Sequence, residues 1–236
     1  MRERVLLHRL GRHSIGICVR IDRVRPYSPH CAAIKSRMTV RIAVLASGRG
    51  SNLQALMEHF GSLGDTTPAR IVLVASNRQN APALDRARGM GIETSVFDAS
   101  DDGASLIDLL SSHRIDLVVL AGYMKRIPPA VIKAYRGQIV NVHPGLLPDF
   151  GGAGMYGARV HEAVIARGAN STGVTVHFVD EELDHGPTVA EWRIPVLAGE
   201  TAQSLAARVL AVEHIVYPRA VEMIATLRER KIFANF

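Results

Sequence analysis

The sequence predicts an α/β protein whose sheet is mostly parallel, is flanked by helices, and carries antiparallel strands near its C-terminal end. From Val40 onward, β-branched apolar runs alternate with helical stretches, which is typical of a parallel sheet covered on both faces. Toward the C-terminus two runs alternate apolar and polar residues, as antiparallel strands do. The chain has 236 residues and is 47% hydrophobic, which is enough to bury one full core.

The elements are expected in the following order. The apolar runs predict five strands at residues 41–46, 71–76, 93–96, 116–120 and 138–142. The stretches after each of the first four predict helices at residues 52–60, 81–90, 104–113 and, beginning with a tolerated proline, 129–135. A helix closed by a glycine, two proline-bounded strands and a long helix opened by a threonine cap are predicted at residues 158–167, 173–179, 188–196 and 201–228.

Residues 1–37 are predicted to be a basic leader and residues 38–236 a single folded domain. The leader holds nine Lys and Arg against two Asp and Glu, whereas the remainder holds 19 against 20, so the net charge of +6 belongs to the leader. Three interpretations stay open: a transit peptide, a basic arm for polyanions, or a segment read from a start codon placed ahead of Met38. A leader without function is favoured. The protein is therefore expected in the cytoplasm, or in a plastid if the leader is a transit peptide.

Composition also limits the cofactors and partners. Both cysteines, Cys18 and Cys31, lie in the leader, so the folded part offers no thiol for a disulfide, a metal or a covalent intermediate. The histidines and acidic residues show no metal-ligand spacing. No apolar run approaches the ~20 residues needed to span a bilayer. We expect small-molecule substrates, no metal, no nucleic acid and no membrane, in a monomer or homodimer.

A glycine-rich segment, residues 46–52, follows the first predicted strand and opens a helix. Backbone N–H groups and the helix dipole at such a place form a cradle for an anion. A dinucleotide fingerprint would need glycine where Leu53 stands and an acid where Ser76 and Asn77 stand, and the lysine of a phosphate-binding P-loop is absent as well. The segment predicts a small phosphate monoester site. The alternative is a glycine turn that only packs.

An amide and an imidazole stand at the end of the fifth predicted strand. Asn141 and His143 are two residues apart, so in extended backbone their side chains leave on the same face. Ligands of open α/β sheets collect at the carboxyl ends of the strands. Asp184, in a turn-prone segment, is expected to fold back beside His143. The three predict a site that stabilises an oxyanion, and the alternative is a core histidine with satisfied partners.

Five motifs stand in this order along the chain: Ser47-Gly48-Arg49-Gly50-Ser51-Asn52-Leu53, Leu120-Ala121-Gly122-Tyr123-Met124, Asn141-Val142-His143-Pro144-Gly145-Leu146-Leu147-Pro148, His177-Phe178-Val179 with Leu183-Asp184-His185-Gly186-Pro187, and Glu213-His214 with Tyr217-Pro218. Together they resemble the phosphoribosylglycinamide formyltransferases of the folate-dependent purine pathway, from about residue 41 to 227. The resemblance implies a Rossmann-like formyltransferase fold. It also implies transfer of a formyl group from 10-formyltetrahydrofolate, as co-substrate, to the amine of N1-(5-phospho-D-ribosyl)glycinamide.

The resemblance further implies roles for particular residues. Asn141 and His143 would hold the oxyanion of a tetrahedral intermediate, and Asp184 would favour the protonated imidazole and help relay a proton. The substrate phosphate and ribose would be held by Gly50, Ser51, Asn52 and Glu213. The folate would contact Leu120, Met124, Lys125, Arg126, Ile127 and Asn141. Lys125 stands where the family usually has arginine, which removes a planar donor pair for the folate carboxylates.

Two other functions stay open. One is a non-catalytic regulator that binds a nucleotide in the same cradle and would not need Asn141, His143 and Asp184 to converge. The other is a sibling formyltetrahydrofolate hydrolase, which carries a regulatory domain ahead of the shared core. The 37 residues of the leader are too few for such a domain, so we expect the transferase.

Overall fold

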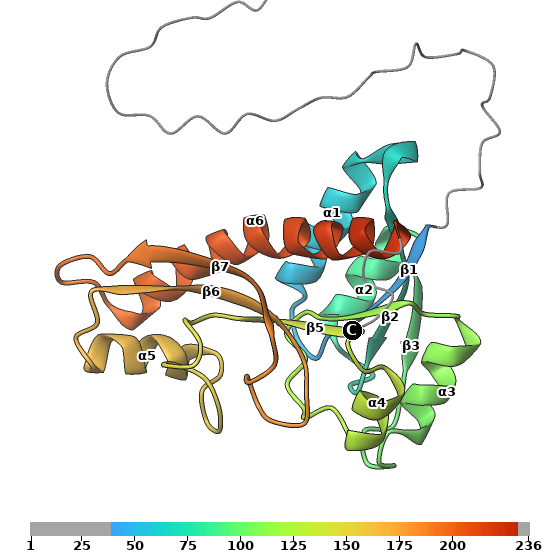
Figure 1. The fold of residues 1–236 in the computed structure, drawn as a ribbon, viewed down its shortest axis with the longest axis horizontal. Helices are drawn as coiled ribbons and strands as arrows, with labels where there is room; N and C mark the ends of the chain where they lie inside the picture. Colours follow the sequence, from blue (N-terminus) through green and yellow to red (C-terminus); the bar gives the residue numbers. More distant parts are fainter. Residues whose placement is uncertain (1–38, 231–236) are drawn as a thin grey trace, which may run out of the picture. The chain divides into compact units, whose positions relative to one another are not determined.

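The computed structural model describes residues 39–230, so the predicted leader lies outside the described residues. Within this part of the chain, seven strands form one sheet in the order β3-β2-β1-β4-β5-β6-β7 (Figure 1). Their bounds are β1 Val40–Leu45, β2 Ala69–Ser76, β3 Glu93–Val96, β4 Leu117–Leu120, β5 Ile139–His143, β6 Ser171–Phe178 and β7 Thr188–Pro195. The first five strands are parallel, and β6 and β7 are antiparallel to their neighbours, which confirms the predicted fold class.

Within residues 39–230, five helices and one short 3-10 turn connect the strands, and a sixth helix follows β7. Their bounds are α1 Ser51–Ser62, η1 Gly64–Thr66, α2 Pro82–Gly89, α3 Ala104–Ser112, α4 Pro129–Ala134, α5 Ala158–Ala166 and α6 Ala202–Glu229. Every predicted strand and helix is present, with ends that differ by no more than two residues. The agreement follows from the strong apolar periodicity of these segments.

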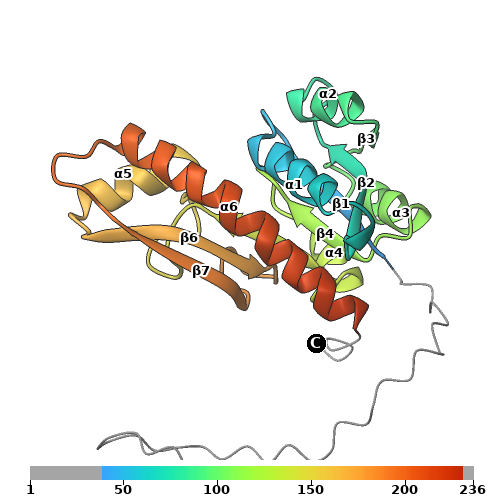
Figure 2. The same cartoon turned by 90° about the horizontal axis from the view of Figure 1, so that it is seen from above.

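The sheet has a hydrophobic core on each face, as its parallel strands require. In β1, Ile42 and Val44 belong to the core beneath α1, α2, α5 and α6, whereas Ala43 and Leu45 belong to the core beneath α3 and α4. Successive residues of a strand point to opposite faces, and both faces of this sheet are covered, so all four side chains are buried. Figure 2 shows α6 running along one face of the sheet beside α1.

The strand order reverses between β1 and β4, which is the place where ligands bind in open parallel sheets. The loops that follow these two strands are joined to each other. Ser47 N–H donates to Gly122 O at 3.1 Å, and the Ser47 hydroxyl accepts from Met124 N–H at 3.1 Å. Both loops therefore lie at the carboxyl edge of the sheet, next to the end of β5.

The long helix α6 is fixed to the same edge. Tyr217 is fully buried, and its hydroxyl lies 2.9 Å from Leu120 O, at the end of β4, and 3.1 Å from Val140 O, the second residue of β5. One turn earlier on the helix, Glu213 faces α1. The Tyr217 hydrogen bonds thus fix the position of Glu213 relative to β4 and β5.

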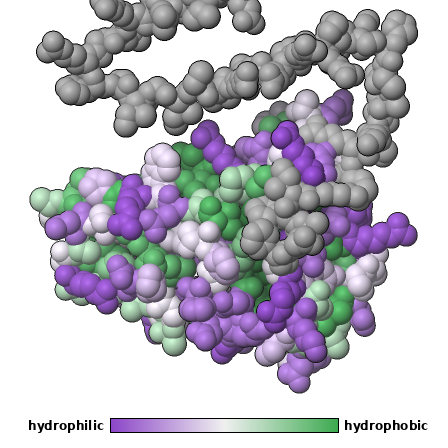
Figure 3. Space-filling model, in the orientation of Figure 1, coloured by the Kyte–Doolittle hydropathy of each residue, from purple (hydrophilic) through white to green (hydrophobic). Residues whose placement is uncertain are grey.

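The surface mixes hydrophilic and hydrophobic side chains over the face seen in Figure 3. Among the helices of residues 39–230, none combines the length and apolar character that a membrane span requires.

Candidate active site

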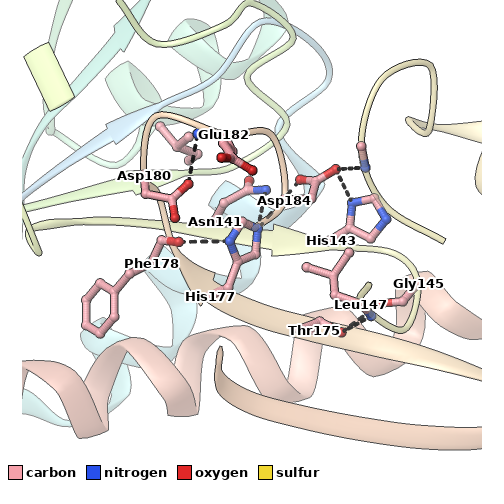
Figure 4. A network of polar contacts seen from close by, with 12 residues as sticks. Asn141, His143, Gly145, Leu147, Thr175, His177, Phe178, Asp180, Glu182 and Asp184 are labelled. Carbon is pink, nitrogen blue, oxygen red and sulfur yellow. Dashed lines mark hydrogen bonds and ion pairs between the residues drawn. The ribbon is translucent and has the colours of Figure 1, made fainter. Parts of the chain in front are cut away.

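Asn141, His143 and Asp184 come together beyond the end of β5 (Figure 4). His143 Nδ1 lies 3.5 Å from Asp184 Oδ2, which is within ion-pair distance and longer than a good hydrogen bond. His143 is 4% exposed and the Asp184 side chain 14%, so water screens this pair only weakly. The fold brings Asp184, 41 residues after His143 in the chain, to the place where the turn composition predicted it.

A second histidine, His177 of β6, lies beside both Asn141 and Asp184, with its Nε2 3.7 Å from Asp184 Oδ1. Its Nδ1 lies 2.9 Å from Phe178 O, so this nitrogen carries the proton, and its Nε2 accepts from Asn141 Nδ2 at 3.2 Å. Burial lowers the pKa of His177, in keeping with a neutral ring. One N–H of Asn141 is thereby engaged and the other stays available to a ligand. The sequence placed His177 in a family motif but assigned it no role, although it stands opposite Asn141 in the β5–β6 pairing.

The imidazole of His143 is held by the backbone of the loop that follows β5. Its Nε2 donates to Phe150 O at 2.7 Å, which leaves Nδ1 facing the carboxylate of Asp184. Two residues further on, Gly152 N–H donates to Asp184 Oδ2 at 2.9 Å. The same short loop therefore orients both members of the pair.

Glycine at position 151 lets the backbone pass close to Leu147 and Asp184. A Cβ at position 151 would lie 2.3 Å from Leu147 Cδ2 and 3.1 Å from Asp184 Cβ. Asp184 itself has a φ of 56°, a left-handed conformation that aspartate tolerates better than most residues. The close approach is what lets Gly152 N–H reach the carboxylate.

The predicted anion cradle forms at the start of α1. Gly50 caps this helix in the left-handed conformation, with a φ of 75°, and no side chain caps the free N–H groups behind it. Arg86 of α2 supports the loop by donating from Nε to Arg49 O at 2.8 Å. Gly50, Ser51 and Asn52 thus present a helix N-terminus whose dipole favours an anion.

Glu213 lies beside the cradle, as the substrate-site prediction requires. Its carboxylate accepts from Asn52 Nδ2 at 2.5 Å, and burial raises its pKa to about 7. The other polar atom of the Asn52 amide, Oδ1, is buried without a partner. A ligand hydroxyl at this place would satisfy both an amide and a carboxyl group.

The residues predicted for the folate lie at the end of β4, in the loop after it and, for Asn141, on β5, and they differ in exposure. Met124, Lys125 and Arg126 are exposed, whereas the side chains of Leu120 and Ile127 are buried in the core beneath α3 and α4. Arg126 Nη2 donates to Glu181 O at 2.6 Å, so this loop is tied to the segment that carries Asp184. Leu120 and Ile127 can meet a ligand mainly through their backbone.

No group of three or more His, Cys, Asp or Glu side chains suited to a metal ion occurs among residues 39–230. Asn141, His143 and Asp184 supply an amide, an imidazole and a carboxylate, which together can polarise a carbonyl and move a proton.

Comparison with known proteins agrees with this site. The model of the formyl transferase family matches residues 40–221, and the chain belongs to this family. Within it, the chain is similar to proteins named phosphoribosylglycinamide formyltransferase. The chloroplastic one of Vigna unguiculata is 41% identical over 208 residues, which cover 84% of this chain and 65% of that protein. The one of Escherichia coli (strain K12) is 36% identical over 192 residues, which cover 79% of this chain and 87% of that protein.

Solved structures give the same result. The phosphoribosylglycinamide formyltransferase from Anaplasma phagocytophilum superposes with a TM-score of 0.73 at 39% identity, covering 79% of this chain and 87% of that one. A formyltetrahydrofolate deformylase from Pseudomonas syringae is also similar, with a TM-score of 0.69, but at 26% identity and with 62% of its chain covered. The sequence identity is therefore lower to this deformylase than to the transferase from Anaplasma phagocytophilum.

Proposed function

We propose that the protein transfers the formyl group of 10-formyltetrahydrofolate to the amine of N1-(5-phospho-D-ribosyl)glycinamide, a step of de novo purine biosynthesis. The observation that carries the proposal is the convergence of Asn141, His143 and Asp184 at the end of β5, with His143 Nδ1 3.5 Å from Asp184 Oδ2. Membership of the formyl transferase family and similarity to proteins that bear this activity in their names support it.

The first step is attack of the substrate amine on the formyl carbon. A C–N bond forms, and the carbonyl electron pair moves to the oxygen, which becomes an oxyanion. The second N–H of Asn141 and a protonated Nδ1 of His143 are the donors that stabilise this charge. Both are preorganised, because His177 holds the amide and Phe150 O holds the ring. Little reorganisation is needed as the charge develops.

The second step is collapse of the intermediate. The electron pair returns to carbon, the bond from the formyl carbon to N10 of the folate breaks, and N10 takes up a proton. The amine must lose one proton in the same turnover, so the net proton change is zero. Asp184 stabilises the positive charge of the protonated His143 ring. Its carboxylate can also pass on, through a water molecule, the proton that the amine loses.

Binding of the two substrates follows from the neighbouring groups. The phosphate would lie on the N–H groups of Gly50, Ser51 and Asn52, with Glu213 accepting from the ribose hydroxyls. The folate would lie along the exposed Met124, Lys125 and Arg126. Lys125 offers a single ammonium to the folate carboxylates, where arginine would offer a planar pair of donors.

The experiment incubates the full chain with 10-formyltetrahydrofolate, with and without the ribonucleotide amine, and follows the formylated product by mass spectrometry. We expect tetrahydrofolate and formylated ribonucleotide in equal amounts, and little formate when the amine is left out. Formate released at the same rate without the amine would favour a hydrolase. Binding of the ribonucleotide without any turnover would favour a non-catalytic regulator.

A further inference from the structure

The residue whose carbonyl holds His143 is contacted through its ring by Arg167, at the C-terminal end of α5. The guanidinium carbon of Arg167 lies 4.7 Å from the centre of the Phe150 ring, and its Nη1 donates to Asp149 O at 3.1 Å. Phe150 is buried, at 4% exposure, whereas Arg167 lies at the surface and covers the ring. A planar cation stacked on an aromatic face in this way is attracted by the ring quadrupole.

These contacts hold the peptide group before Phe150 and the Phe150 side chain. Asp149 O and Phe150 N–H belong to the same peptide group, directly before the Phe150 side chain. The N–H of this group donates to Leu146 O at 3.0 Å. The next peptide group consists of Phe150 O and Gly151 N–H, and this N–H donates to Pro148 O at 3.3 Å. The Phe150 carbonyl accepts from His143 Nε2 at 2.7 Å.

We propose that Arg167 is a positioning residue for formyl transfer: it orients the Phe150 carbonyl and so holds the His143 ring with Nδ1 toward Asp184. The inference rests on the proposed function of this site. Arg167 suits the task because its own backbone is fixed as the C-terminal cap of α5, with its N–H donating to Ala163 O and Ile165 O. The helix C-terminus also favours its positive charge.

The effect of Arg167 extends to the carboxylate. Gly152, two residues after Phe150, donates its N–H to Asp184 Oδ2 at 2.9 Å. A loop released at Asp149 and Phe150 would loosen this contact as well as the one to His143. Loss of Arg167 is thus expected to disturb the His143–Asp184 geometry without removing any group that touches the substrates.

The test compares Arg167→Met with a matched control on the same helix. Arg159 stacks on Tyr156 at 5.0 Å, also as a cation over an aromatic ring, but Tyr156 is half exposed and holds no contact to His143 or Asp184 in the described structure. We expect kcat of Arg167→Met to fall about 10-fold to 100-fold with little change in KM for the ribonucleotide, as misplacement of a reacting group does. Arg159→Met should keep the kcat of the unaltered protein.

Arg167→Lys separates charge from shape. Lysine keeps the positive charge and can still donate a hydrogen bond, but it has no planar group to lie over the Phe150 ring. We therefore expect kcat of Arg167→Lys to fall only about threefold. An equal loss of kcat in Arg167→Met and Arg159→Met, or a change in KM alone, would overturn the proposal. Comparable melting temperatures of the two methionine variants would show that any difference in kcat does not come from global unfolding.

A second readout does not depend on turnover. With 15N-labelled histidine, the Nε2–H of His143 should give a slowly exchanging proton signal, assigned by its loss in His143→Gln. We expect this signal to be lost or to exchange rapidly in Arg167→Met and to persist in Arg159→Met. If the signal persists unchanged in Arg167→Met, the positioning role is wrong, whatever the activity of the unaltered protein. If the signal behaves as expected but the unaltered protein transfers no formyl group, the proposed function fails and the contact network stands.

Discussion

His143 uses its two ring nitrogens for different purposes. Nε2 is held by a backbone carbonyl, and Nδ1 faces the carboxylate of Asp184. The sequence predicted that Asn141 and His143 share a face and that Asp184 lies nearby, because strand periodicity and turn composition are local properties. It did not predict which nitrogen faces Asp184, because that depends on the path of residues 149–152 in three dimensions. The role of His177 was missed for a similar reason, since cross-strand neighbours become known only with the register.

Glu213 gives a prediction for the pH dependence of stability. Its folded-state pKa is raised from 4.5 to about 7, so the folded state holds a proton that the unfolded chain releases. The stability that this proton provides is fully present below pH 4.5 and is lost as the pH rises through about 7. Glu213→Gln mimics the protonated form, so at pH 8 the variant should be more stable than the unaltered protein by about 2–3 kcal/mol.

Urea unfolding at pH 5 and pH 8 measures this difference. The advantage of the glutamine variant should shrink as the pH falls, because Glu213 then carries its own proton. A difference of the same size at both pH values would mean that the carboxyl group is not perturbed by burial.

At the scale of elements, the buried hydroxyl of Tyr217 joins α6 to the backbone of β4 and β5. Tyr217→Phe removes the donor to Leu120 O and Val140 O, which should lower the free energy of unfolding by about 1–2 kcal/mol. Because Glu213 lies one turn away, we also expect weaker binding of the ribonucleotide. Urea unfolding and KM check the two effects.

Tyr156→Phe serves as the control, since Tyr156 is 50% exposed. The control should change the free energy of unfolding by no more than a few tenths of a kcal/mol. Equal stability of Tyr217→Phe and the control would show that the buried hydroxyl contributes nothing net to fixing α6.

The elements themselves were predictable, because each depends on a periodicity that the fold preserves. The five parallel strands read as continuous apolar runs since both faces of the sheet are covered, as Ile42 and Ala43 show on β1. Contacts to backbone atoms could not be predicted from the sequence. Ser47 joins the loops after β1 and β4 through N–H and hydroxyl groups, and nothing in the type of residue identifies these partners.

At the scale of the whole molecule, the site residues lie between positions 50 and 213, and the family match begins at residue 40. Removal of residues 1–37 is therefore expected to leave kcat/KM for formyl transfer within about twofold, because no group assigned to binding or chemistry is lost. Steady-state kinetics of the shortened chain measures this. The full and shortened chains can also be compared for RNA binding, which tests the interpretation of the leader as a basic arm. A loss of RNA affinity on removal of the leader would contradict the expectation that it has no function.

The central claim is that His143 and Asp184 act as one unit on the oxyanion and the proton. The most direct measurement is kcat for His143→Ala, Asp184→Asn and the double variant. Each single change should lower kcat by about 10²-fold to 10³-fold, as loss of an oxyanion donor does, and the double variant should lose little more than the worse single variant. Losses that multiply, or full activity in either single variant, would contradict the account.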